Sequence, residues 1–130
     1  MPYFMYDQAI ESITRRILSG MPESQTSEFL YVFLPGDRPE LNTDPSAWTD
    51  ADERVGEEHY ARLRAETEAG RVILAGRSQD GIGPAIVIFR AGSEDEARRF
   101  MDEDPFVVNG LFRASLHPFR AALVEGRRPG

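Results

Sequence analysis

The sequence predicts an α+β protein in which strands and helices follow the order β-α-β-β-α-β from residue 28 onward. Three observations support this prediction: two helical patterns, a hairpin signal and four apolar or β-branched runs. The expected helices are 49–69 and 93–104, the hairpin turn is 79–84, and the expected strands are 28–34, 71–78, 85–90 and 112–119. This order is that of the ferredoxin-like fold, in which two helices cover one face of a four-stranded antiparallel sheet.

The first expected strand, 28–34, is almost continuously apolar and aromatic and is followed by Pro35 and Gly36. Its lack of polar alternation indicates a central position in the sheet with both faces covered. In the other strands, too, apolar residues occupy positions that point to both faces of the sheet. Two helices can cover only one of these faces. The uncovered face therefore predicts a homodimer in which two sheets pack together.

Local signals set the ends of both expected helices. Thr49 and Asp52 open the first helix and Gly70 ends it, whereas Ser93 and Glu96 form the pattern of a capping box for the second. Pro105 disfavours helical geometry for the residue before it, so the second helix should end at Asp104. The segments 37–48 and 106–111 are expected to be a long loop and a turn.

The chain divides into an N-terminal helix and linker (1–27), the α+β domain (28–122) and a polar tail (123–130). The N-terminal helix is expected over 7–18, because isoleucines recur there at three- and four-residue spacing. A helix with one apolar stripe should pack against its own domain or against a second subunit.

Composition excludes several classes of function. The chain has 130 residues, no cysteine and a net charge of -7, and all of its 15 basic residues are arginine. Disulfides, thiolate nucleophiles and Schiff-base lysines are therefore excluded, and the negative charge argues against a nucleic-acid binder. No run approaches the roughly 18 apolar residues of a membrane span, and no basic segment precedes an apolar run at the N-terminus. We expect a cytoplasmic protein without membrane contact.

The candidate reactive groups are one histidine and one carboxylate that both face the interior. His59 lies between Val55 and Leu63 on the inner face of its helix, and Asp104 continues the apolar face of the helix that precedes it. An imidazole is the natural general acid or base near neutral pH, and a carboxylate beside it fixes one tautomer and favours the charged form. Two alternatives stay open: a core histidine bonded to a backbone carbonyl, and an aspartate that caps the turn 106–108.

Four further residues are candidates for substrate binding: Tyr31, Arg77, Ser78 and Phe106. Tyr31 and Phe106 are more often core residues, yet an aromatic wall beside a His-Asp pair suits a flat organic ligand. One histidine and one aspartate fall short of the three protein ligands of an ordinary catalytic zinc site. We therefore expect no metal and no cofactor.

Four short motifs, in order and spacing, resemble the YciI-like (YCII-related) family: Glu58-His-Tyr-Ala-Arg-Leu63, Gly70-Arg-Val-Ile-Leu-Ala-Gly76, Ser93-Glu-Asp-Glu-Ala97 and Asp104-Pro-Phe106. The resemblance covers about residues 28–120. It implies a ferredoxin-like fold that dimerises through its sheets as a dimeric α/β barrel. It also implies a pocket with a His-Asp pair, proposed as an active site, at the positions of His59 and Asp104. Arg77 departs from the family, which commonly has proline there, and would add a cation at the pocket rim or point to solvent.

The expected function is therefore chemistry on a small, flat or cyclic organic molecule without a cofactor. His59 would act as general acid and base and Asp104 would orient it, in proton abstraction, isomerisation or elimination, which makes the protein a lyase or isomerase. The alternative is a non-catalytic module that binds a ligand or a protein and uses the pair structurally. The exposure of the His-Asp pair distinguishes the two hypotheses. A catalytic pair must be reachable by substrate, whereas a structural pair can be sealed in the core.

Overall fold

The computed structural model describes residues 26–126. Its elements are β1 (Ser27–Pro35), the 3-10 helices η2 (Pro39–Asn42) and η3 (Pro45–Ala47), α2 (Asp50–Glu68), β2 (Val72–Arg77), β3 (Ala85–Ala91), α3 (Glu94–Asp102), α4 (Pro105–Val108) and β4 (Phe112–Phe119). The helix expected over 7–18 lies outside the described residues, so its packing stays a prediction.

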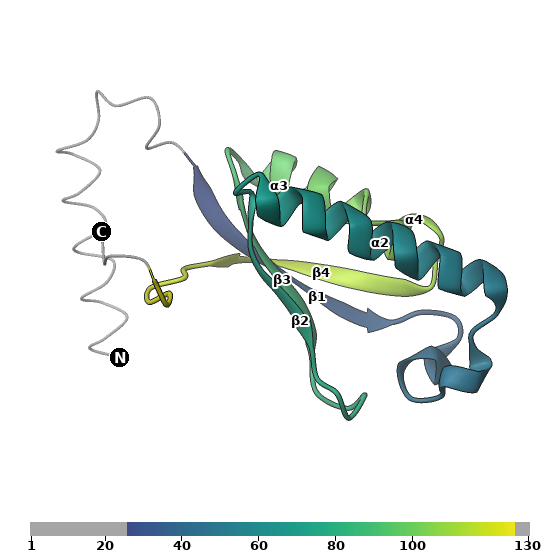
Figure 1. Ribbon diagram of the computed structural model, residues 1–130. Helices are drawn as coiled ribbons and strands as arrows, with labels where there is room; N and C mark the ends of the chain where they lie inside the picture. Colours follow the sequence, from purple (N-terminus) through teal and green to yellow (C-terminus); the bar gives the residue numbers. More distant parts are fainter. Residues whose placement is uncertain (1–25, 127–130) are drawn as a thin grey trace, which may run out of the picture.

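The strands form one antiparallel sheet in the order β2-β3-β1-β4. Figure 1 shows α2, α3 and α4 together on one side of this sheet. The α+β class, the order β-α-β-β-α-β and the ferredoxin-like arrangement predicted from the sequence are thereby confirmed. The apolar run in β1 is explained by its central place between β3 and β4.

The core lies between the sheet and the helices. On β1, Tyr31 is opposite Val87 of β3 and Leu116 of β4, so these side chains share the helix-covered face. Phe100 of α3 and Leu63 of α2 complete the same buried cluster. The alternation of side chains along a strand therefore places Tyr31 beneath the helices.

The side chains that alternate with these along each strand point to the opposite face of the sheet. Leu30 and Ile88 are paired there in the centre, and both are half-buried. Leu34 and Leu74 are 42% and 49% exposed. Among residues 26–126 no helix covers this face (Figure 1).

The predicted starts of α2 and α3 and the predicted end of α2 are confirmed, whereas one capping bond differs from the expectation. Thr49 and Asp52 form the capping box of α2, and the chain turns away at Gly70, whose φ of +87° suits glycine. Ser93 caps α3 by accepting from the backbone N–H of Glu96. The carboxylate of Glu96, however, accepts from the N–H of Gly92, so the reciprocal capping bond expected from the sequence is replaced by a bond one residue earlier.

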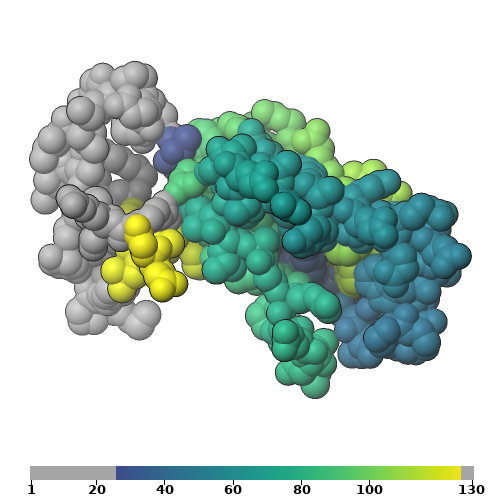
Figure 2. All heavy atoms as spheres, viewed as in Figure 1, coloured from purple at the N-terminus to yellow at the C-terminus, as the bar shows by residue number. Residues whose placement is uncertain are grey.

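The segment 37–48 was expected to be a long loop, but it contains η2 and η3 and is joined to α2 by a side-chain clamp. Arg38 donates two hydrogen bonds, of 2.9 and 2.7 Å, to the carboxylate of Asp52 at the start of α2. The bonds from Arg38, with the backbone N–H of Thr49, hold the pKa of Asp52 well below its usual range. Figure 2 shows this segment (blue) packed against the start of α2.

No helix within residues 26–126 has the length and apolar character needed to cross a bilayer.

Candidate active site

Asp104 starts the short helix α4, which the sequence-based prediction had taken for a turn. α3 ends at Asp102, and Asp104 is the N-cap of α4 with Pro105 at the first helical position. Its Oδ1 accepts a 3.0 Å hydrogen bond from the N–H of Phe106. The expectation that Asp104 caps the following residues is confirmed, and the predicted helix end is corrected by two residues.

His59 reaches Asp104 from the inner face of α2. Its Nδ1 lies 2.8 Å from Oδ1 and 3.0 Å from Oδ2 of the carboxylate. Asp104 has no exposed surface, and 17% of the His59 side chain is exposed. The predicted His-Asp pair is therefore present as a buried contact between α2 and α4.

The acceptor chemistry of Asp104 fixes the tautomer of His59. An ionised carboxylate can only accept, so Nδ1 must carry a proton, and in the neutral ring Nε2 is then the free acceptor. Within the described part of the chain, Nε2 has no hydrogen-bond partner. Among the described residues, Nη1 of Arg62 is the side-chain nitrogen or oxygen atom that is both buried and without a partner. Because Nε2 of His59 has no partner either, it cannot be buried. Nε2 therefore reaches the surface, and the pair is not sealed.

Tyr31 supplies a third donor to the carboxylate. Its hydroxyl donates a 2.6 Å hydrogen bond to Oδ2 of Asp104. Burial raises the pKa of Tyr31 above its usual range, and the negative charge of Asp104 raises it further, so the hydroxyl stays protonated. Tyr31 has no exposed surface and lies behind Asp104. This position favours a role for Tyr31 in holding the carboxylate, whereas the sequence-based prediction had placed it in contact with the substrate.

Aromatic side chains pack against the imidazole of His59. Phe106 stacks on His59, with ring centroids 4.1 Å apart and an interplanar angle of 28°. Phe33 meets the same imidazole edge-on at 5.5 Å, and Trp48 packs edge-on against Phe106 at 5.9 Å. The predicted site residue Phe106 is therefore in contact with the pair.

Arg77 and Ser78 lie away from the pair, at the edge of the sheet. Arg77 ends the edge strand β2, which β3 separates from β1. Both the N–H and the hydroxyl of Ser78 donate to the carbonyl of Pro84 across the hairpin. No hydrogen bond or ion pair of the described residues joins either of them to His59 or Asp104. Their expected role in substrate binding stays a prediction, and the structure suggests a hairpin role for Ser78.

A cavity of about 370 Å³ lies beside the start of β4 and does not include the pair. Its lining consists of Gly36, Asp37, Val107, Gly110, Phe112, Arg113 and Ala114. Phe112 packs edge-on against Phe106, with ring centroids 5.0 Å apart, so this aromatic contact separates the cavity from His59. Within residues 26–126 no three metal-binding side chains converge.

The sequence analysis missed Phe33 and Arg62, although simple periodicities could have found them. Phe33 is two residues after Tyr31 on the same strand and therefore shares its face. Arg62 follows His59 by three residues on α2 and lies on the same side of the helix. Neither signal names a partner by itself, because the rings that meet Phe33 belong to α2, α4 and β4, and Arg62 bonds to a carbonyl of α3.

Comparison with known families agrees with this fold. The family model of the YCII-related domain matches residues 29–119, which is most of the chain, and the protein belongs to this family. A search of curated proteins found no match to the chain.

Proposed function

We propose that the protein is a small-molecule enzyme in which His59 transfers protons and Asp104 orients it, with no cofactor. One observation carries the proposal: Nδ1 is held by a fully buried carboxylate while Nε2 reaches the surface. A histidine with one nitrogen fixed and the other open is the arrangement of a general base. A purely structural histidine would gain nothing from an open Nε2.

The chemistry supported by this arrangement is proton transfer at carbon. Nε2 takes a proton from a carbon next to a carbonyl group, and the electron pair of the broken C–H bond moves into that carbonyl as an enolate. The imidazolium that forms is stabilised by Asp104. In an isomerisation the carbonyl re-forms as the proton returns to a different carbon of a conjugated enolate. In an elimination the carbonyl re-forms, a carbon–carbon double bond forms, and the bond to a group on the next carbon breaks, with the proton delivered to that departing group. Isomerase and lyase activities both follow from the same first step.

The surroundings of His59 favour a small organic substrate with a flat ring. Phe106 and Trp48 are both half-buried and present aromatic surface beside the imidazole. Offset or edge-on contact with such rings is favourable for a flat ligand. We further propose that the enzyme works as a homodimer joined through the uncovered sheet face.

Chemical modification tests whether Nε2 is available for this role. Diethylpyrocarbonate acylates accessible unprotonated imidazoles, and peptide mapping by mass spectrometry separates His59 from the exposed His117. We expect His59 to be modified in the folded protein, and we expect a molecule that binds beside Phe106 to protect it. A folded protein in which only His117 reacts would rule out His59 as a general base.

The alternative function is a non-catalytic ligand-binding module of the same fold. It is favoured by the position of the 370 Å³ cavity, which excludes both residues of the pair. Small ligands screened by thermal shift separate the two proposals. Binders whose effect is lost in Ala114→Phe and kept in His59→Gln would locate binding in the cavity and support the module.

A further inference from the structure

Gly56 lies inside α2, one turn before His59 and on the same side of the helix. Glycine in a helix interior lowers stability relative to alanine, because its unfolded backbone has more conformational freedom to lose. Gly56 does not have the positive φ that would require glycine, unlike Gly70 at the end of the same helix. The backbone conformation therefore does not explain why this position is a glycine.

Close packing does not explain the glycine either. A Cβ at position 56 would lie 3.7 Å from Cζ3 of Trp48, and 3.8 and 3.9 Å from Cζ and Cε1 of Phe106. These are ordinary van der Waals distances, so an alanine would fit without moving either ring. A Cβ at Gly36, by contrast, would lie 2.6 Å from the carbonyl oxygen of Leu111. Gly56 thus leaves room for a methyl group between itself, Trp48 and Phe106, a space that we call the Gly56 gap.

Contacts outside the gap hold both of its aromatic rings in place. Nε1 of Trp48 donates a 2.9 Å hydrogen bond to the carbonyl of Leu41. The ring of Phe106 meets Phe112 edge-on, with centroids 5.0 Å apart. Gly56, Trp48 and Phe106 are each only partly buried, so the gap is open to solvent. The two rings therefore form a fixed aromatic surface that a side chain at position 56 would cover.

Phe106 connects the Gly56 gap to the His-Asp pair. The imidazole of His59 stacks on the Phe106 ring, with centroids 4.1 Å apart, and Cζ and Cε1 of the same ring border the gap. The three atoms nearest to a Cβ at position 56 are all ring carbons, so the gap suits an apolar group. A ligand that enters it would contact the aromatic ring on which the imidazole lies.

We propose that Gly56 is a specificity-determining residue: it keeps the gap free, so that the edge of a flat ring enters beside Trp48 and Phe106 and the substrate is held next to His59. The inference rests on the proposed function, because it assigns a place to the ring of that substrate. Aromatic edges and faces favour contact with another flat ring. A saturated ring is puckered and thicker, so a gap of this width excludes it.

Binding of acetophenone, a flat aromatic ketone, tests the proposal. Trp48 is the one tryptophan of the sequence, so its indole N–H gives a single signal in ¹H–¹⁵N spectra that reports on the gap. Acetophenone should shift this signal in a saturable way, whereas cyclohexyl methyl ketone, its saturated counterpart, should not. Gly56→Ala should weaken acetophenone binding about tenfold, as expected for one extra carbon in a binding site, and Gly56→Leu should abolish it.

Two controls separate binding from packing. Ala61→Leu adds bulk at an exposed position of the same helix and should bind acetophenone as the parent protein does. Gly56→Ala should also raise the urea midpoint of unfolding, because alanine is the better helix former and its methyl group fits against both rings. The alanine variant carries the test if Gly56→Leu does not fold.

Several results would overturn the proposal: a parent protein that does not bind acetophenone, equal binding of the saturated ketone, or parent-like affinity in the folded Gly56 variants. A lower urea midpoint for Gly56→Ala would overturn it too, because packing would then require the glycine. The reactivity of His59 towards diethylpyrocarbonate is measured separately. Acetophenone binding that is lost in the Gly56 variants, together with an unreactive His59, would keep the gap as a ring-binding site and remove only the general base.

Discussion

The hydroxyl of Tyr31 lies 2.6 Å from Oδ2 of Asp104, and this bond joins the central strand of the sheet to the start of a helix 73 residues later in the chain. Together with the N–H of Phe106 and Nδ1 of His59, it surrounds the buried carboxylate with donors from β1, α2 and α4. Because Asp104 has no exposed surface, these donors replace the water that an ordinary aspartate would keep.

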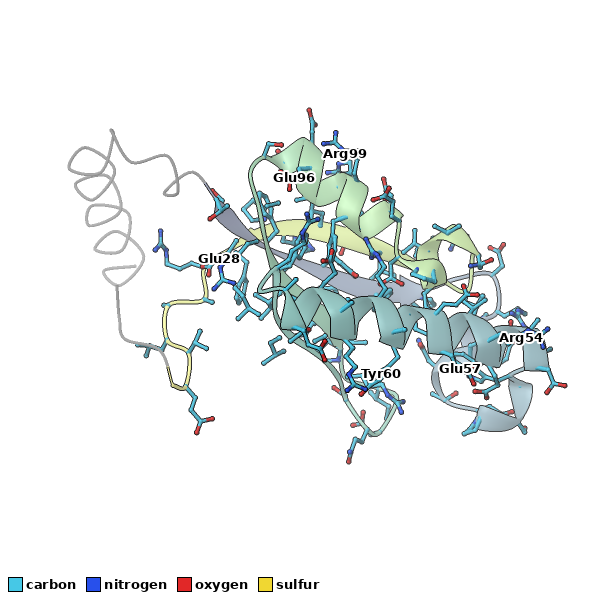
Figure 3. The ribbon with its side chains drawn as sticks, turned by 45° about the horizontal axis from the view of Figure 1, so that its top comes forward. Glu28, Arg54, Glu57, Tyr60, Glu96 and Arg99 are labelled. Carbon is cyan, nitrogen blue, oxygen red and sulfur yellow. The ribbon has the colours of Figure 1, made fainter. Side chains whose placement is uncertain are left out.

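Tyr31→Phe should destabilise the protein by about 1.5–3 kcal/mol, the range for a hydrogen bond to a charged group. The ring and its packing are kept, so the loss reports on the hydroxyl alone. Urea unfolding followed by fluorescence measures the change. Tyr60→Phe is the control, since Tyr60 is 67% exposed and lies on the side of α2 that faces away from α3 (Figure 3). Equal stability of both variants would show that the bond to Asp104 contributes nothing.

Asp104→Asn should shift His59 towards the tautomer with the proton on Nε2. An amide has one acceptor oxygen, and Tyr31, Phe106 and Nδ1–H of His59 all require an acceptor there. When the amide NH2 faces Nδ1, that nitrogen must become the acceptor. Long-range ¹H–¹⁵N correlation spectra of the ring distinguish the tautomers. Asparagine is also a good N-cap, so α4 should persist.

The contradicting result is an Asp104→Asn protein that keeps the parent tautomer. It would mean that Asp104 does not set the tautomer of His59, and the orienting role would be lost. Asp102→Asn, an exposed carboxylate at the end of α3, serves as the control for removing one negative charge nearby.

The clamp between Arg38 and Asp52 predicts a loss of stability in acid. The hydrogen bonds from Arg38 and Thr49 lower the pKa of Asp52 in the folded protein below its unfolded value of about 3.9. A carboxyl with a lowered folded pKa contributes stability that is fully present above the unfolded pKa and is lost as pH falls towards the folded one. Stability should therefore decline below about pH 4.

Asp52→Asn should flatten this decline when urea unfolding is repeated at several pH values between neutral and acid. The substituted amide cannot change its charge, so this part of the pH dependence disappears even though the variant is less stable throughout. Asp50→Asn, an exposed carboxylate in the same first turn of α2, should keep the parental slope. Identical slopes in all three proteins would show that the clamp does not act through the ionisation of Asp52.

The uncovered face of the sheet predicts a dimer. Ile88 lies at its centre, paired with Leu30 on one side and Leu74 on the other. Light scattering at micromolar concentration should give twice the mass of one chain. Ile88→Glu should give the monomer, because burying an unpaired carboxylate in an apolar interface is costly. Tyr60→Glu, on the outer side of α2, should leave the dimer intact, and a monomeric parent protein would refute the proposed assembly.

Local sequence patterns determined most of the elements and identified the two side chains of the His59–Asp104 pair. Helical periodicity placed His59 on the inner face of α2, and Pro105 ended the preceding helix near Asp104, because both effects act within a few residues. They could not show that Pro105 starts a new helix with Asp104 as its N-cap. A four-residue helix carries too little periodicity to be recognised.

Only the tertiary structure decided what surrounds the pair. The order β2-β3-β1-β4 puts Tyr31 beneath Asp104 and leaves Arg77 on an edge strand, and strand order depends on pairing between distant segments. The stack of Phe106 on His59 and the packing of Arg62 on the Phe100 ring likewise need α2, α3 and α4 to lie on one face of the sheet. A sequence pattern shows which side of each helix or strand is buried. Which of these sides contact each other depends on how all the elements pack around one core.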